Sequence, residues 1–61
     1  MSISEMEDIK MWTCISALGV KPLFDGKVWR FSYRSLTEIV GTGHSIYEAA
    51  RAFYTKVQGD S

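Results

Sequence analysis

Apolar residues recur at helical spacing in the last third of the chain. They stand at positions i, i+3, i+4, i+7, i+8 and i+11, namely Ile46, Ala49, Ala50, Phe53, Tyr54 and Val57. Such a stripe is typical of a helix with one buried face. Ser45 and Glu48 have the spacing of a capping box, and Gly59 stands where a helix end favours glycine. We therefore predict a helix between Ser45 and Gly59.

The first third of the chain has a second helical pattern. Its apolar positions are Met11, Cys14, Ile15 and Leu18, with Ile9 and Trp12 on the flank. Two capping boxes fit its start, Ser2 with Glu5 and Ser4 with Glu7. Gly19 suits the position just after the helix. These features predict a helix from about Ser4 to Leu18.

The segment between the two helices has the pattern of a β-hairpin. Asp25-Gly26 indicates a two-residue type I′ turn between strands Val20–Phe24 and Lys27–Arg34. That turn would place Leu23 opposite Val28, and opposed residues share a face of the sheet. One face then gathers Val20, Phe24, Trp29, Phe31 and Tyr33. The other gathers Lys21, Leu23, Val28, Arg30, Ser32 and Arg34.

A third strand is expected at about Thr37 to Val40, after a turn at Arg34–Leu36 that contains no glycine. The order is therefore helix, two or three antiparallel strands, helix. Each helix and the sheet has one apolar face, and a two-layer α+β sandwich buries all three. We predict a single domain over residues 1–61, because a chain of this length has room for one core.

This order, together with a Gly-x-Gly-x-Ser turn before an alanine-rich helix, resembles the double-stranded RNA-binding domain. The stretch from Gly41 to Ala50 looks like the turn of that family into its last helix. The same stretch is similar to HicB-like antitoxin domains, in which a strand leads through glycine and Ser or Thr into a Glu-Ala helix. Either resemblance covers about Trp29 to Val57.

The departures from the first family concern its RNA-binding lysines. Members that bind RNA carry lysine directly after the serine and again after the alanine. Ile46, Tyr47 and Ala50 stand at those positions here, and none is basic. The resemblance therefore implies the fold without the RNA function. HicB-like domains usually neutralise a toxin, so that likeness implies a protein partner.

Charge and composition argue against a nucleic-acid-binding, a membrane-spanning and a secreted protein. The 61 residues include seven Lys and Arg and seven Asp and Glu, so the formal net charge is zero. We therefore expect no general electrostatic attraction to nucleic acid or to lipid. The longest apolar stretch, Met11 to Val20, is too short to cross a membrane. A signal peptide would begin with basic residues, whereas this chain begins with Glu5, Glu7 and Asp8. We expect a cytoplasmic protein.

No enzyme chemistry is expected from the reactive side chains. Cys14 and His44 could form a nucleophile and base, but Cys14 falls on an apolar helix stripe and His44 in a turn. One cysteine forms no internal disulfide, and one cysteine with one histidine does not supply four zinc ligands. The acids near the N-terminus are explained by helix capping. We predict no catalytic residues, no metal site and no cofactor.

Two surfaces remain as candidate binding sites. Glycines before a helix N-terminus could hold an anion or nucleic acid, although a tight strand-to-helix turn also explains them. This first candidate site consists of Gly43, His44, Ser45 and Tyr47. The second is the basic sheet face, with partner-binding candidates Lys21, Leu23, Val28, Arg30 and Arg34.

Arginine beside exposed apolar residues is typical of protein interfaces. We therefore predict a small non-enzymatic interaction module, of an accessory, inhibitory or antitoxin-like kind, that binds a protein partner or forms a homodimer. Short chains of this kind include proteins of mobile elements and phages. The alternative is a weak nucleic-acid-binding domain that uses the basic sheet face and the start of the last helix.

Overall fold

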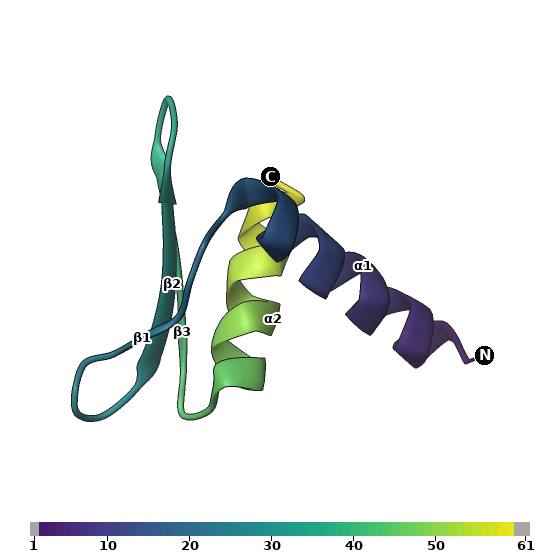
Figure 1. Cartoon of the computed structure of the whole chain (residues 1–61), viewed down its shortest axis with the longest axis horizontal. Coiled ribbons are helices and arrows are strands. Elements are labelled where there is room, and N and C mark those ends of the chain that lie inside the picture. The colour runs from purple at the N-terminus through teal and green to yellow at the C-terminus, as the bar shows by residue number, and fades with distance from the viewer. Residues whose placement is uncertain (1, 60–61) are drawn as a thin grey trace.

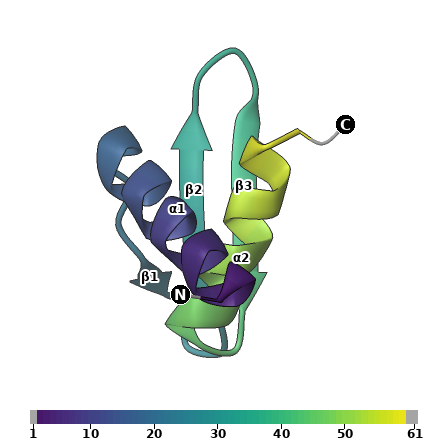
Figure 2. The same ribbon diagram turned by 90° about the vertical axis from the view of Figure 1, so that its right-hand side faces the viewer.

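The C-terminal helix packs on one face of a three-stranded antiparallel sheet, and the N-terminal helix packs mainly against the C-terminal helix on the same side (Figure 1). The structure, a computed structural model, describes residues 2–59. Its elements are α1 (Ile3–Leu18), β1 (Leu23–Phe24), β2 (Trp29–Arg34), β3 (Glu38–Gly43) and α2 (Ile46–Val57). The strands lie in the order β1-β2-β3, and none of the described residues forms a helix on the other face of the sheet (Figures 1 and 2). The predicted α+β architecture is therefore correct.

Capping explains where α1 begins and ends. The Ser2 side chain accepts the Glu5 N–H at 3.2 Å, and the Glu5 carboxylate accepts the Ser2 N–H at 2.9 Å. These hydrogen bonds select the first of the two predicted capping boxes, so the helix begins at Ile3. The hydrogen bond that the Glu5 carboxylate accepts from the Ser2 backbone N–H lowers the pKa of this carboxyl. Gly19 ends the helix with a left-handed φ of 72°.

The predicted capping residues, Ser45 and Glu48, cap the start of α2, but one of the two hydrogen bonds has a different partner. Ser45 Oγ accepts the Glu48 N–H at 3.1 Å, as expected for an N-cap. The Glu48 carboxylate, however, accepts the N–H of His44 and not that of Ser45, at 2.9 Å. Gly59 follows the helix with a φ of 84°, as the sequence predicts.

The first hairpin has a different register from the predicted one. Leu23 lies opposite Arg30 and Phe24 opposite Trp29, and not Leu23 opposite Val28. The Asp25 N–H donates to the Val28 carbonyl at 3.1 Å, so the two central residues of the turn are Gly26 and Lys27. Asp25 occupies the first turn position because its Oδ1 accepts the N–H of Lys27 and that of Val28, each at 3.0 Å.

Moving the turn by one residue shifts the pairing by two, and a shift of two leaves the side chains of the paired residues on their predicted faces. In β2 the aromatic residues Trp29, Phe31 and Tyr33 are accordingly buried or half-buried, and the residues between them are exposed. The first strand is shorter than the predicted Val20–Phe24. It begins only after Pro22, which has no N–H to donate to β2.

The third strand extends beyond the predicted Thr37–Val40. It continues through Gly41 to Gly43, residues expected in a turn, and pairs with β2 along its whole length. Glycine is needed here because the strand touches α2. A Cβ on Gly41 would overlap the backbone of Phe53, and one on Gly43 would lie 2.5 Å from the Glu48 Cβ. The glycines thus serve strand–helix packing.

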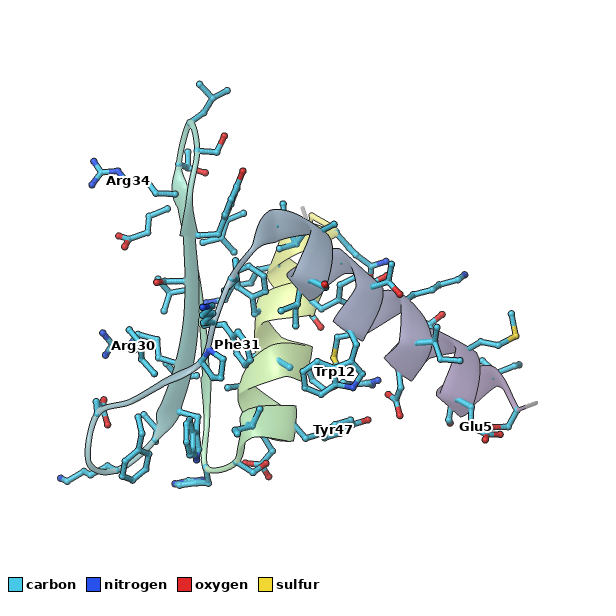
Figure 3. The ribbon with its side chains drawn as sticks, viewed as in Figure 1. Glu5, Trp12, Arg30, Phe31, Arg34 and Tyr47 are labelled. Carbon is cyan, nitrogen blue, oxygen red and sulfur yellow. The ribbon has the colours of Figure 1, made fainter. Side chains whose placement is uncertain are left out.

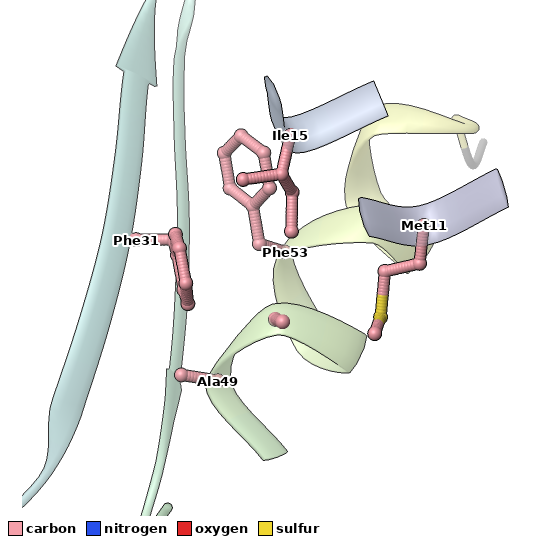
Figure 4. Packing of buried hydrophobic residues seen from close by; sticks show 6 residues of the cluster. Met11, Ile15, Phe31, Ala49 and Phe53 are labelled. Atoms are coloured by element: carbon pink, nitrogen blue, oxygen red, sulfur yellow. The ribbon is translucent and has the colours of Figure 1, made fainter. Parts of the chain in front are cut away.

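The buried core is small and lies between α2, β2 and one side of α1 (Figure 4). Its members are Met11, Ile15, Phe31, Ala49, Ala50 and Phe53. The rings of Phe31 and Phe53 lie 6.1 Å apart, centre to centre, and join the sheet to α2. The predicted apolar stripes supply all six residues. Cys14 and Leu18, expected in the same stripe of α1, are only half-buried.

Candidate functional site

The uncovered face of the sheet carries most of the predicted partner-binding residues. Strand pairing sets three rows of outward side chains, which are Leu23, Arg30 and Thr42, then Ser32 and Val40, then Arg34 and Glu38. We call these seven residues the outer sheet face. Arg30 and Arg34 both point away from the helices (Figure 3). Leu23 exposes 65% of its surface beside Arg30.

Carboxylates lie next to both arginines of the outer sheet face. The guanidinium of Arg30 lies 3.6 Å from Asp25 Oδ2, and Glu38 lies directly opposite Arg34 on β3. The two backbone N–H groups bound by Asp25, helped by Arg30, lower the pKa of the Asp25 carboxyl, so it stays ionised beside the arginine. The predicted basic sheet face therefore carries acids beside its bases, and its charge is mixed.

Two predicted residues lie off this face. Val28 is half-buried in the turn, where its backbone binds Asp25, and Lys21 is exposed in the segment before β1. Val28 was placed in a strand because the predicted turn is centred one residue too early, and Lys21 because the predicted first strand begins before Pro22. The structure thus brings together Leu23, Arg30 and Arg34, and separates Lys21 and Val28 from them.

The predicted anion site is occupied by the chain's own groups. The Glu48 carboxylate binds the His44 N–H, and Ser45 Oγ binds the Glu48 N–H. A negative charge is therefore already at the start of α2, where an anion would bind. Gly43 packs against Glu48 and Ala49, which accounts for the glycine without a ligand.

Tyr47, the remaining candidate in that site, connects the two helices. Its hydroxyl donates to Asp8 Oδ1 at 2.8 Å, and the Arg51 guanidinium lies 3.5 Å from the same oxygen. Arg51 also lies over the Tyr47 ring, 5.9 Å from its centre. The hydrogen bond to Asp8 raises the pKa of the Tyr47 hydroxyl. The sequence does not predict this cluster, because no local pattern relates residues so distant in the chain.

A second exposed surface runs along α1. Four large apolar residues follow one another at intervals of three, and they expose 40% to 79% of their surfaces. We call them the α1 ridge: Ile3, Met6, Ile9 and Trp12. Trp12 and Tyr47 both lie on the lower side of α1 in Figure 3. The sequence placed Ile9 and Trp12 only on the flank of the buried stripe.

The reactive groups considered above are not gathered into a site. His44 is exposed in the turn before α2, 4.0 Å from Glu48, whereas Cys14 lies on α1 as a free thiol. Within residues 2–59, no group of three or more potential metal-binding side chains comes together, and no pocket is found. Neither helix in this range is long and apolar enough to cross a membrane.

The chain was compared with protein families, curated proteins and solved structures. None of the family models matches the chain, and no curated protein and no solved structure matches it significantly.

Proposed function

We propose that this chain is a small non-enzymatic protein-interaction module, and that its outer sheet face binds another protein. In this role it acts as an accessory or inhibitory protein by covering part of a partner's surface. The observation that carries the proposal is the uncovered face on which Leu23 stands beside Arg30. Protein interfaces combine exposed apolar side chains with arginine in this way.

The charge pattern of this face favours a protein partner over a nucleic acid. A phosphate backbone is bound by several uncompensated basic residues. Here Asp25 lies beside Arg30, and Glu38 lies opposite Arg34. Paired charges of both signs suit a protein surface, which itself carries both signs and is selected by their arrangement.

The test compares capture of proteins from the cells that produce this chain. Immobilised wild type is compared with the variants Leu23→Glu and Arg30→Glu, and with Thr55→Glu as a control that also introduces an acid. Thr55 is exposed on α2, which lies on the opposite side of the sheet (Figure 1). A specific partner is retained by wild type and Thr55→Glu and lost by both outer-face variants.

The nucleic-acid alternative has its own measurement. Fluorescence anisotropy of labelled double-stranded RNA and DNA is followed at low and moderate salt against wild type and the double variant Arg30→Ala, Arg34→Ala. We expect no sequence-independent binding in the micromolar range. Micromolar binding that both substitutions abolish would replace the protein-interaction proposal with the nucleic-acid one.

A further inference from the structure

We propose that the α1 ridge is the contact surface of a homodimer, in which α1 of one copy packs antiparallel against α1 of a second copy. This surface lies on the opposite side of the molecule from the outer sheet face (Figure 1). The proposal therefore stands independently of the function proposed above.

The helix has more apolar surface than its own chain covers. Met11 and Ile15 are buried, and at about 100° per residue Met6 and Ile9 stand on the opposite side of the helix from them. A surface helix normally has a single apolar stripe, with polar residues opposite. Exposed apolar side chains in sequence along one element mark an interaction site. Residues three apart turn by about 60° around the helix, so Ile3, Met6 and Ile9 form this second apolar side and Trp12 lies at its edge.

The small size of the domain favours a second copy of the chain as the partner that covers the α1 ridge. Within residues 2–59 the core has six buried side chains, and oligomerisation is a common way for domains this small to gain stability. The accessible surface is 4459 Å², against about 4000 Å² expected for a compact monomer of this mass. A standard interface removes about 800 Å² per partner, which needs a face as long as α1. A twofold contact buries the same ridge on both copies.

Side-chain size selects the antiparallel orientation. The free side of α1 carries large residues in its first half, at Met6 and Ile9, and small exposed ones in its second half, at Thr13, Ser16 and Ala17. Antiparallel helices place the large side chains of one copy against the small ones of the other. Parallel helices would set large against large and leave a gap between the small residues, which loses packing contacts.

Charge selects the same orientation. The three acids of α1, Glu5, Glu7 and Asp8, lie in its first half, and no charged residue follows Lys10 within the helix. Asp8 binds Tyr47 and Arg51 of its own chain, but parallel helices would bring Glu5 and Glu7 near the same acids of the second copy. Antiparallel helices place the acids beside the uncharged half of the partner and set Lys10 near the centre.

Sedimentation equilibrium from about 1 µM to about 500 µM protein tests the association. Wild type is compared with Ile9→Glu and Met6→Glu, and with Leu36→Glu as a matched control, since Leu36 is a fully exposed apolar residue of the β2–β3 turn. We expect a dimer, a dissociation constant raised about tenfold or more in both ridge variants, and a control close to wild type. Circular dichroism checks that each variant is folded.

The salt dependence of the association distinguishes this dimer from a second possible form of self-association, a head-to-tail assembly. If acidic α1 instead bound the arginines of the outer sheet face, the chain would add copies head to tail. That assembly would exceed two copies and weaken between about 50 mM and about 500 mM NaCl. The α1 dimer stops at two copies and does not weaken with salt. A monomer throughout, larger assemblies, or equal loss in Leu36→Glu would each overturn the proposal.

Disulfide trapping tests the orientation. In a Cys14→Ser background, Met6→Cys and Ser16→Cys are made as separate single variants and mixed before mild oxidation. The antiparallel dimer yields mainly the mixed disulfide between the two variants. A parallel dimer would yield disulfides of each variant with itself, and would show the proposed arrangement to be wrong.

Discussion

The hydroxyl of Tyr47 donates a 2.8 Å hydrogen bond to the carboxylate of Asp8, and this bond joins the first turn of α2 to the middle of α1. Arg51 binds the same carboxylate oxygen and covers the Tyr47 ring. The contact therefore ties α1 to α2, against which α1 packs.

This hydrogen bond should be visible in the alkaline titration of Tyr47. The bond to Asp8 raises the pKa of the phenol above its ordinary value of 10.0. A raised pKa means that the neutral phenol stabilises the fold at lower pH, and that this stabilisation is lost as the pH rises through the folded-state value. We expect NMR of the ring carbon to show Tyr47 titrating above 10.0. In Asp8→Asn the pKa should fall back toward 10.0, and an unchanged pKa there would contradict the assigned cause.

Asp25 should show the opposite pH dependence. Its pKa is lowered because the carboxylate accepts the N–H groups of Val28 and Lys27. The ionised group therefore stabilises the turn above the unfolded-state pKa of Asp, about 3.9, and the effect is lost as the pH falls through the lower folded-state value. The amide signals of Lys27 and Val28 should shift with the same midpoint as the Asp25 carboxyl. Separate midpoints would show that the side chain does not hold the turn.

Gly41 should tolerate no side chain. In Gly41→Ala the new Cβ overlaps the Phe53 backbone, so β3 and α2 must move apart at a cost of about 1 to 3 kcal/mol in the free energy of unfolding. Urea denaturation followed by tryptophan fluorescence measures the change. Thr42→Ala, on the neighbouring exposed position, is the control and should lie within about 0.5 kcal/mol of wild type. Equal stability of the two variants would mean that the close strand–helix contact is absent.

Lys56 should protect the free edge of β3. Its Nζ donates to the Val40 carbonyl at 2.7 Å, and β3 is an edge strand of the sheet. Lysine on an edge discourages pairing with another chain. We expect Lys56→Met to scatter more light than wild type at high concentration, with a rise in β-sheet signal. Lys56→Arg keeps the charge and should behave as wild type; the same aggregation in both variants would exclude the edge as the cause.

Much of the fold could be predicted because its signals are local. The serines that cap the two helices, the glycines that end them and the alternation along β2 each act within a few residues. The inward and outward faces of the hairpin were correct even though its register was not. A register error of two residues changes which residues pair across the strands, but it leaves each paired side chain on the same face of the sheet.

The candidate site was predicted less completely, for a physical reason. Arg30 and Arg34 were placed on one face correctly, but the carboxylates beside them were not, since Glu38 comes from a strand whose pairing the sequence left open. Val28 was assigned to the face through the misplaced turn, and Lys21 through a first strand that was predicted too long. The extent of the α1 ridge was hidden for a similar reason, because burial of one side of a helix depends on what packs against it.

The sequence by itself determined the element order, the helix ends and the apolar faces, since capping, glycine conformation and side-chain period act between near neighbours. Only the tertiary structure decided the hairpin register, the extension of β3 through Gly41 and Gly43, and the pairing of Asp8 with Tyr47. These features depend on how closely α2 approaches the sheet and on where α1 leaves it. Contacts between distant segments set both, and no local pattern encodes them.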